Sequence, residues 1–283
     1  MLLLALMWGL SIPVTKLGLQ DIPPLTLTAL RFAVAVLLLL PVVFWRRVHW
    51  QSMPRLAAVG ILGVGVGQVT QVFGIAATSA SVGTILSATI PVFMVVFATV
   101  RLKQRVTTRQ QIGLVIAFIG IAVVALGHGA TADPAHQSSL WGVFWMLVSA
   151  LCIAFYYVWS VELTEVYGAP TVAAWSTLFG FVALLPWAGW EALQVPMKLT
   201  AQGFAVAVYL GVAVSVAGLF LWLHILKTVP AGIAASVQYL QPVFGIGASA
   251  IVFAEPLGPT FLLGVLLILA GLALTMVSPR RAQ

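Results

Sequence analysis

The sequence predicts an all-α integral membrane protein with ten transmembrane helices, arranged as two inverted five-helix repeats. Composition, the spacing of apolar runs and an internal similarity each point to this fold. Of the 283 residues, 62% are hydrophobic and only 7% are charged, whereas soluble domains carry about 25% charged residues. So few charges cannot cover a water-facing surface, and we therefore expect lipid to surround most of the chain.

Ten apolar runs lie between charged or turn-forming segments. Each is long enough, or nearly so, to cross about 30 Å of hydrocarbon as a helix. In chain order the runs cover residues 2–19, 24–45, 56–77, 81–100, 110–126, 140–160, 170–190, 203–226, 231–253 and 259–277. Only the segment ATSAS separates the third run from the fourth. The first run lacks the charged start and cleavage site of a signal peptide, so we interpret it as a span.

The 13 Lys and Arg outnumber the six Asp and Glu, and their positions follow the predicted topology. Segments on the side of the N-terminus hold Arg46, Arg47, Arg55, Arg101, Lys103, Arg105, Arg109, Lys227, Arg280 and Arg281, whereas loops on the other side hold only Lys198. Cytoplasmic loops are rich in Lys and Arg. We therefore expect both termini in the cytoplasm, a location in a bacterial inner (plasma) membrane, and no nucleic-acid partner.

Shifting the chain by 151 residues aligns its two halves through three predicted helices. The aligned pairs are Gly60 with Gly211, Gly67 with Gly218, Pro91 with Pro242, Gly113 with Gly264, and Gly120 with Gly271. Since each half holds five helices, an odd number, the second half must enter the membrane from the opposite side. The prediction divides the chain into a first repeat at 1–127, an external linker at 128–139 and a second repeat at 140–283.

Inverted repeats are typical of secondary transporters, which expose a central site to each side in turn. The sequence therefore favours a carrier for a small-molecule solute, with a channel or a lipid flippase as alternatives. An intramembrane enzyme is disfavoured because the sequence contains no HExxH, GxSxG or P-loop motif and its four histidines are dispersed. We expect no metal and no cofactor. The single Cys152 excludes an intramolecular disulfide, and a homo-oligomer stays open.

Several short motifs resemble the EamA branch of the drug/metabolite transporter superfamily. They are Trp8-Gly9 followed by Lys16, Pro23-Pro24 with Arg31, and the Pro91 and Pro242 helices with Glu255 after the second. The resemblance implies ten helices, a cavity lined by helices 1, 3, 4, 6, 8 and 9, and transport of amino acids or related metabolites, with export the expected direction. The chain departs from the pattern at Gln104, where the first repeat often carries Glu, and this weakens any role for a symmetric pair of acids.

Polar side chains near the two repeat-related prolines are the first candidates for solute contact. A proline inside a helix frees the carbonyl four residues earlier, here those of Ser87 and Gln238. Such groups need a partner, and a cavity can supply one. The predicted substrate-binding residues are Gln238, Gln241, Tyr239, Ser87, Gln68, Gln71, Tyr156 and Trp8, with Ser215 as a further candidate. For the polar side chains the alternative is hydrogen bonding between helices, and for the aromatic ones an interfacial belt.

Charged or titratable groups within spans are the second kind of candidate, because they are costly in a bilayer. Lys16, Arg31 and His224 are the predicted sites for charge recognition or coupling. Lys16 could bind a solute carboxylate or pair with Asp21, and Arg31, placed toward the outer end of its helix, is expected to act as a structural anchor. No carboxylate is expected near the midplane, which disfavours a buried acidic proton relay.

Overall fold

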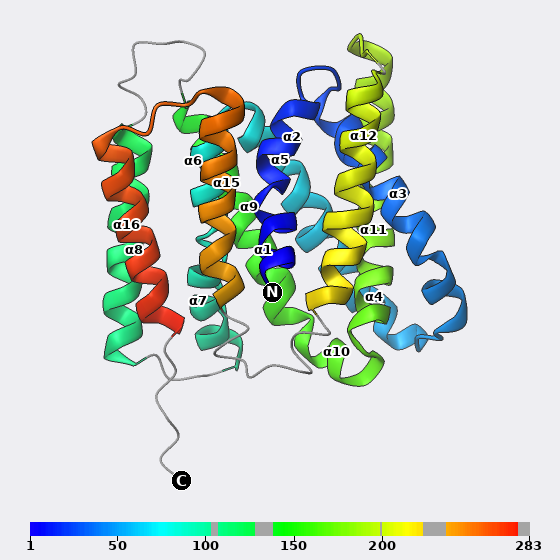
Figure 1. Ribbon diagram of the computed structural model, residues 1–283. Coiled ribbons are helices and arrows are strands. Elements are labelled where there is room, and N and C mark those ends of the chain that lie inside the picture. The colour runs from blue at the N-terminus through cyan, green and yellow to red at the C-terminus, as the bar shows by residue number, and fades with distance from the viewer. Residues whose placement is uncertain (103–106, 128–137, 199, 223–235, 277–283) are drawn as a thin grey trace.

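The computed structural model describes residues 1–102, 107–127, 138–198, 200–222 and 236–276. Every regular element in these ranges is a helix, and the helices form one bundle (Figure 1). The prediction of an all-α chain is therefore confirmed for the part that the structure describes.

The first half contains α1 (Leu2–Gly9), α2 (Ser11–Gly18), α3 (Pro24–Trp45), a 3-10 turn η1 (Trp50–Ser52), α4 (Met53–Ala58), a π-helix η2 (Val59–Val66), α5 (Gly67–Ala76), α6 (Ala80–Ser87), α7 (Ile90–Leu102) and α8 (Thr108–Gly127). The second half contains α9 (Leu140–Trp159), α10 (Val161–Tyr167), α11 (Ala169–Gln194), α12 (Ala201–Tyr209), a second π-helix η5 (Leu210–Ala217), α15 (Ser236–Phe253) and α16 (Pro259–Met276).

Six helical segments in the described ranges are long and apolar enough to cross a membrane. They are Pro24–Trp45, Trp50–Ala76, Ala80–Arg101, Leu140–Trp159, Ala169–Gln194 and Ala201–Trp222. Four shorter apolar helices accompany them: Leu2–Gly18, Thr108–Val124, Leu240–Phe253 and Pro259–Leu274. Each of these segments overlaps one of the predicted apolar runs. The third and fourth runs do separate at ATSAS, where Ser79 Oγ accepts a hydrogen bond from Val82 N–H and caps α6.

Proline explains two interruptions within the predicted spans. Pro13 has no N–H for the carbonyl of Gly9, and α1 ends at Gly9. The predicted fourth helix is likewise two helices, since α6 ends at Ser87 and α7 begins at Ile90, next to Pro91. Pro91 has no N–H for the carbonyl of Ser87, the residue at which α6 ends. By contrast, Pro242 lies inside the unbroken α15, so the two repeat-related prolines differ in their effect.

The two π-helices occupy matching positions in the two halves. The first residues of η2 and η5, Val59 and Leu210, are 151 residues apart, which is the shift that aligns the glycines. π-Helices are rare and are often found at functional sites. Inside η5, the hydroxyl of Ser215 donates to the carbonyl oxygen of Leu210 at 2.9 Å, which keeps this side chain on the inner surface of the bundle.

Glycines bring α8 and α16 into close contact at one edge of the bundle, where Figure 1 shows them side by side. A Cβ added at Gly271 would lie 2.5 Å from the carbonyl oxygen of Gly113. A Cβ added at Gly120 would lie 2.9 Å from that of Gly264. Small residues permit this kind of backbone approach in membranes, so these positions leave no room for a side chain.

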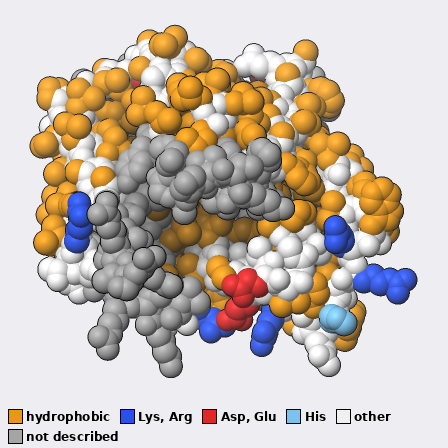
Figure 2. All heavy atoms as spheres, turned by 60° about the horizontal axis from the view of Figure 1, so that its bottom comes forward, with side chains coloured by type: hydrophobic (Ala, Val, Ile, Leu, Met, Phe, Trp, Pro, Cys, Tyr) orange, Lys and Arg blue, Asp and Glu red, His pale blue; other side chains and the backbone are white. Residues whose placement is uncertain are grey.

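The two ends of the bundle differ in charge. The end with α4, α10 and the C-terminus of α7 carries the exposed residues Arg46, Arg47, Arg55, Arg101 and Arg109. Viewed from this end, Lys and Arg side chains lie around the rim (Figure 2). Here Arg101 forms an ion pair with Glu162 at 2.8 Å. At the opposite end, Lys198 N–H donates to the backbone oxygen of Asp21 at 3.1 Å.

Candidate functional site

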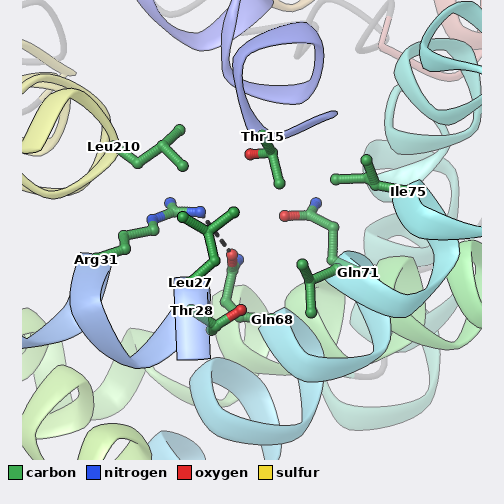
Figure 3. Close-up of a pocket in the computed structure, with 9 residues that line it drawn as sticks. Thr15, Leu27, Thr28, Arg31, Gln68, Gln71, Ile75 and Leu210 are labelled. Atoms are coloured by element: carbon green, nitrogen blue, oxygen red, sulfur yellow. Dashed lines mark hydrogen bonds between the residues drawn. The ribbon is translucent and has the colours of Figure 1, made fainter. Parts of the chain in front are cut away.

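A polar pocket lies between α2, α3, α5 and η5 (Figure 3). Its lining residues are Thr15 from α2, Leu27, Thr28 and Arg31 from α3, Gln68, Gln71, Val72 and Ile75 from α5, and Leu210 from η5. Its empty volume is about 240 Å³, the open side included. The space that the lining side chains enclose is only about 10 Å³, which is about enough for one water molecule, so the lining must move apart before a solute can enter.

Arg31 connects three helices at this pocket. Its Nε donates to Ser215 Oγ and its Nη1 donates to Gln68 Oε1, each at 3.0 Å. The guanidinium also lies 5.6 Å from the ring centre of Phe32. Arg31 follows Pro24 by seven residues, or roughly 10 Å of helix, and its side chain turns into the bundle. The guanidinium therefore lies inside the bundle, where it bonds to α5 and η5.

The partners of Arg31 are neutral. Within the described ranges, no carboxylate lies within 4.0 Å of its guanidinium, and the ion pair found is that of Arg101 with Glu162. Arginine stays protonated in proteins and has five N–H donors. Two hydrogen bonds to described residues leave further N–H groups for another acceptor. The pocket thus contains a positive charge that described side chains do not neutralise.

Gln68 and Gln71 were predicted to share a helix face, and both line the pocket. Gln68 holds Arg31, while the Gln71 amide points toward Thr15 (Figure 3) and has no hydrogen-bond partner in the described part of the chain. Thr15 and Thr28 donate to the carbonyl oxygens of Ser11 and Pro24 at 2.7 and 2.8 Å. Their hydroxyl oxygens, like the Gln71 amide, can therefore accept or share hydrogen bonds with a bound molecule.

The predicted aromatic candidates lie at helix contacts outside this pocket. Trp8 donates through Nε1 to the carbonyl oxygen of Val214 at 3.2 Å and lies 5.8 Å from Trp222 between ring centres. Tyr156 packs its Cβ against Gly63 in η2 and contacts the ring of Tyr157. Both positions serve packing between helices in this structure.

The candidates near the two prolines lie on α6 and α15, again outside the pocket. Ser87 is buried, and its Oγ has no hydrogen-bond partner among the described residues. The backbone oxygen of Gln241 faces Gly9, where α15 packs against α1. His224 and the side chains of Gln238 and Tyr239 lie outside what the structure describes. The pocket thus uses the first, second, third and eighth predicted helices, whereas the prediction centred on the fourth and ninth.

Lys16 closes the C-terminal end of α5 and does not line the pocket. Its Nζ donates to the carbonyl oxygens of Ile75, Ala76 and Thr78 at 2.8, 3.1 and 2.6 Å. A cation at a helix C-terminus is favoured by the helix dipole. The predicted pairing with Asp21 is not observed, because Asp21 Oδ2 accepts instead from Thr200 Oγ1 at 2.6 Å.

Two buried carboxylates hold the N-termini of helices at the same end of the bundle. Glu255 accepts from the N–H groups of Ala80 and Ser81 at 2.7 and 2.9 Å, at the start of α6. Glu191 Oε2 accepts from Thr26 N–H at 2.7 Å and from Thr26 Oγ1 at 2.9 Å, near the start of α3. Such charge-assisted hydrogen bonds satisfy N–H groups in the first turn of a helix, which have no partner within the helix. No group of three or more metal-binding side chains occurs in the described ranges.

The long apolar helices are those of an integral membrane protein, and polar sites among such helices are found in transporters. The chain belongs to the EamA-like transporter family, whose model matches residues 1–126 and 140–277. The resemblance noted from the motifs is therefore confirmed, and the family indicates a transporter rather than an enzyme.

Relatives with similar length support the same class. An uncharacterized transporter from Archaeoglobus fulgidus is 26% identical over 94% of this chain and 93% of its own length. A probable terminal-alkyne amino-acid exporter from Streptantibioticus cattleyicolor is 28% identical over 94% of this chain and 89% of its own. A crystal structure with 18% sequence identity has a TM-score of 0.66 and covers 97% of this chain and 94% of that one, which shows a shared fold.

Proposed function

We propose that this protein is a secondary transporter that carries a small polar or amphipathic solute through the pocket at Arg31, Gln68 and Gln71. The observation that carries the proposal is the pocket itself, a polar site among helices whose outer surfaces are apolar. Charged and unsatisfied polar groups are costly within a membrane, and this cost supports a functional role for the pocket.

The proposed architecture is ten transmembrane helices in two inverted repeats. The matching π-helices support it, and so does the contact between α8 and α16. A shift of 151 residues aligns Gly113 with Gly264 and Gly120 with Gly271. The observed contacts, Gly113 with Gly271 and Gly120 with Gly264, therefore exchange with each other under the repeat. Reciprocal contacts of this kind are the signature of a two-fold relation.

The arginine-bearing end is the proposed cytoplasmic end, and both termini are proposed to be cytoplasmic. The positive-inside rule supports this orientation, because Arg46, Arg47, Arg55, Arg101 and Arg109 are exposed there. A bacterial inner membrane is the proposed location. Lys16, Glu191 and Glu255 then lie at the outer end, where they hold the ends of α5, α3 and α6.

Alternating access requires that these outer contacts break and reform. In the described state, Lys16 ties α2 to the end of α5, and Glu255 ties the segment after α15 to the start of α6. The proposed cycle releases these bonds when the outer side opens and restores them when the pocket faces the cytoplasm. This exchange matches the two-halves mechanism known for inverted repeats.

An amino acid or related metabolite is the proposed solute, and export the proposed direction. The polar lining, with Arg31, Gln68 and Gln71, supports a polar solute. The relative named as a probable amino-acid exporter supports the class.

Counterflow in proteoliposomes tests this function. Purified protein is reconstituted with an unlabelled panel of amino acids and related metabolites inside, one at a time, and uptake of the labelled solute is followed against protein-free liposomes. The carrier model predicts saturable counterflow for one chemical class. Conductance without saturation would identify a channel, and lipid scrambling without solute counterflow would identify a flippase.

A further inference from the structure

We propose that Arg31 binds a carboxylate of the solute, so that the pocket selects small organic carboxylates over their neutral amides. The inference rests on the proposed transport function and narrows its substrate class. It begins from the charge of the pocket. Arg31 contributes one positive charge to the lining, and none of the nine lining residues is acidic.

The acids at the outer end are already engaged elsewhere. Glu255 accepts from two N–H groups of α6, and Glu191 accepts from Thr26. Asp21 accepts from Thr200. These carboxylates act at helix ends and do not pair with Arg31, so the described chain supplies it with no anion. A buried charge without a counter-ion is strongly unfavourable, and an anionic solute would provide the missing charge.

The guanidinium is already oriented for such a partner. Ser215 and Gln68 fix Nε and Nη1 from two different helices, while no described residue accepts a hydrogen bond from Nη2. Guanidinium groups bind carboxylates through parallel N–H groups in a planar, two-bond geometry. Holding the group in place before binding reduces the entropy lost when the solute arrives.

The rest of the lining limits what the carboxylate can be attached to. Leu27, Val72, Ile75 and Leu210 provide apolar walls, suited to a short hydrocarbon chain. Gln71, Thr15 and Thr28 offer neutral oxygen atoms, which could receive an ammonium group or a hydroxyl. The chemistry of the lining is therefore compatible with two sources of the carboxylate, an amino acid and a carboxylic acid without the ammonium group.

Matched ligand pairs test the inference with the wild-type protein. The panel consists of aliphatic amino acids, the corresponding carboxylic acids that lack the amino group, and the carboxamide of each compound. Binding to the purified full-length protein in detergent is measured by the ligand-dependent rise in its unfolding temperature. At least one carboxylate should bind about tenfold or more tightly than its amide, as expected for a lost charged hydrogen bond.

The outcomes distinguish an amino acid from a simple carboxylic acid as the ligand, and they test carboxylate binding separately from transport. Preference for the amino acids identifies an ammonium subsite, and preference for the deaminated acids identifies a simple carboxylate site. If no carboxylate binds more tightly than its amide, the inference is overturned. Counterflow of a solute without a carboxylate would overturn it while leaving transport intact. Carboxylate-selective binding without counterflow of the same compound would keep the inference and reject the transport function.

Variants of Arg31 link the preference to this residue. Arg31→Gln should remove the preference, and Arg31→Lys, which keeps the charge but not the planar fork, should retain only part of it. Arg109→Gln is the matched control and should leave the preference unchanged. Arg109 is exposed near the start of α8, a helix that does not line the pocket. Gel filtration and circular dichroism check folding. A folded Arg31→Gln protein with the wild-type preference would contradict the assignment, and the ligand pairs decide the matter if that variant does not fold.

Discussion

Arg31, Ser215 and Gln68 form a network in which a buried cation depends on two neutral oxygen atoms. Ser215 has a double role, since its hydroxyl also donates to the carbonyl oxygen of Leu210 within the π-helix η5. A side chain that both accepts from the cation and donates to a backbone carbonyl fixes the direction of the guanidinium. At the scale of single residues, the pocket is therefore an oriented charge held by its neighbours.

Replacing Ser215 with Ala should weaken solute binding without removing the charge. We expect the dissociation constant of the transported solute to rise about fivefold, equivalent to about 1 kcal/mol, because the guanidinium loses one of its two acceptors. Ser215→Thr should restore binding by restoring the hydroxyl. Ser249→Ala is the control, since Ser249 bonds only within α15. Unchanged affinity in a folded Ser215→Ala protein would argue against a positioning role.

Variants of Gln71 and Gln241 distinguish two candidate sites: the observed pocket, which contains Gln71, and the site predicted from the sequence between the fourth and ninth helices, which contains Gln241. Gln71→Leu should reduce transport about tenfold or more and change stability little, because the Gln71 amide has no partner among described residues. Gln241→Ala tests the earlier prediction in the same flux assay. Gln111→Leu, at an exposed position on α8, controls for added apolar surface. Loss of flux in Gln241→Ala alone would favour the site predicted from the sequence.

The site was predictable in part from individual residues. Gln68, Gln71 and Ser215 were identified because polar side chains are rare in such apolar helices. Thr15 and Thr28 gave no comparable signal, because a threonine in a helix can satisfy its hydroxyl on its own backbone, as both do here. The inward direction of Arg31 depends on how α3 is rotated against η5 and α5. That rotation is set by tertiary packing, which residue spacing alone does not determine.

At the scale of elements, the junction between α5 and α6 is held by opposite charges. Lys16 satisfies carbonyl groups at the end of α5, and Glu255 satisfies N–H groups at the start of α6. Each charge complements the helix dipole at its own terminus. The junction is therefore a natural place for the outer side of the proposed carrier to open.

Glu255→Gln should loosen this junction. The neutral amide is a weaker acceptor for two N–H groups, and we expect a loss of about 1–3 kcal/mol in the closed state. A cysteine at Ser81, which is buried and whose Oγ lacks a described partner, reports the opening in a Cys152→Ser background. An impermeant thiol reagent added outside should label it faster after Glu255→Gln. Glu162→Gln, which alters an exposed residue at the opposite end, should not change the labelling rate. Equal labelling rates for the two variants would contradict the proposal that the junction between α5 and α6 opens.

The contact between α8 and α16 should tolerate no added methyl group. Gly271→Ala places a Cβ 2.5 Å from the oxygen of Gly113, so we expect a destabilisation of about 1–3 kcal/mol and a lower unfolding temperature. Gly247→Ala is the matched control, because its Cβ would meet nothing within 4 Å and alanine favours a helix. Equal unfolding temperatures for the two variants would contradict the close packing.

Element positions followed well from the sequence, and their internal breaks less so. The helix at Pro24–Trp45 has the predicted bounds. The third span begins at Trp50, earlier than predicted. Its first α-helix has Pro54 in its first turn, a position where proline is favoured, whereas the prediction excluded this segment because it is not apolar. Neither π-helix was predicted. Apolar residues dominate both segments, and hydropathy does not distinguish an α-helical from a π-helical hydrogen-bond pattern.

At the scale of the whole molecule, the two halves resemble each other in architecture but differ in chemistry. The paired π-helices and the reciprocal glycine contacts support the proposed repeat relation. The residue that corresponds to Arg31 in the second half is a serine. Gly211 packs on the backbone of Arg31, and its repeat partner Gly60 packs on the backbone of Ser176. In the proposed repeat, the positive charge of the pocket therefore comes from the first half, whereas the second half supplies Leu210 and Ser215.

Counterflow with matched variants tests the central claim, that the Arg31 pocket carries a solute across the membrane. Proteoliposomes containing wild-type protein, Gln71→Leu or the control Gln111→Leu are compared with protein-free liposomes at equal protein density. We predict saturable counterflow for the wild type and the control, reduced about tenfold or more in Gln71→Leu. Equal saturable counterflow in all three proteins, or none in a folded wild-type protein across the panel, would contradict the claim.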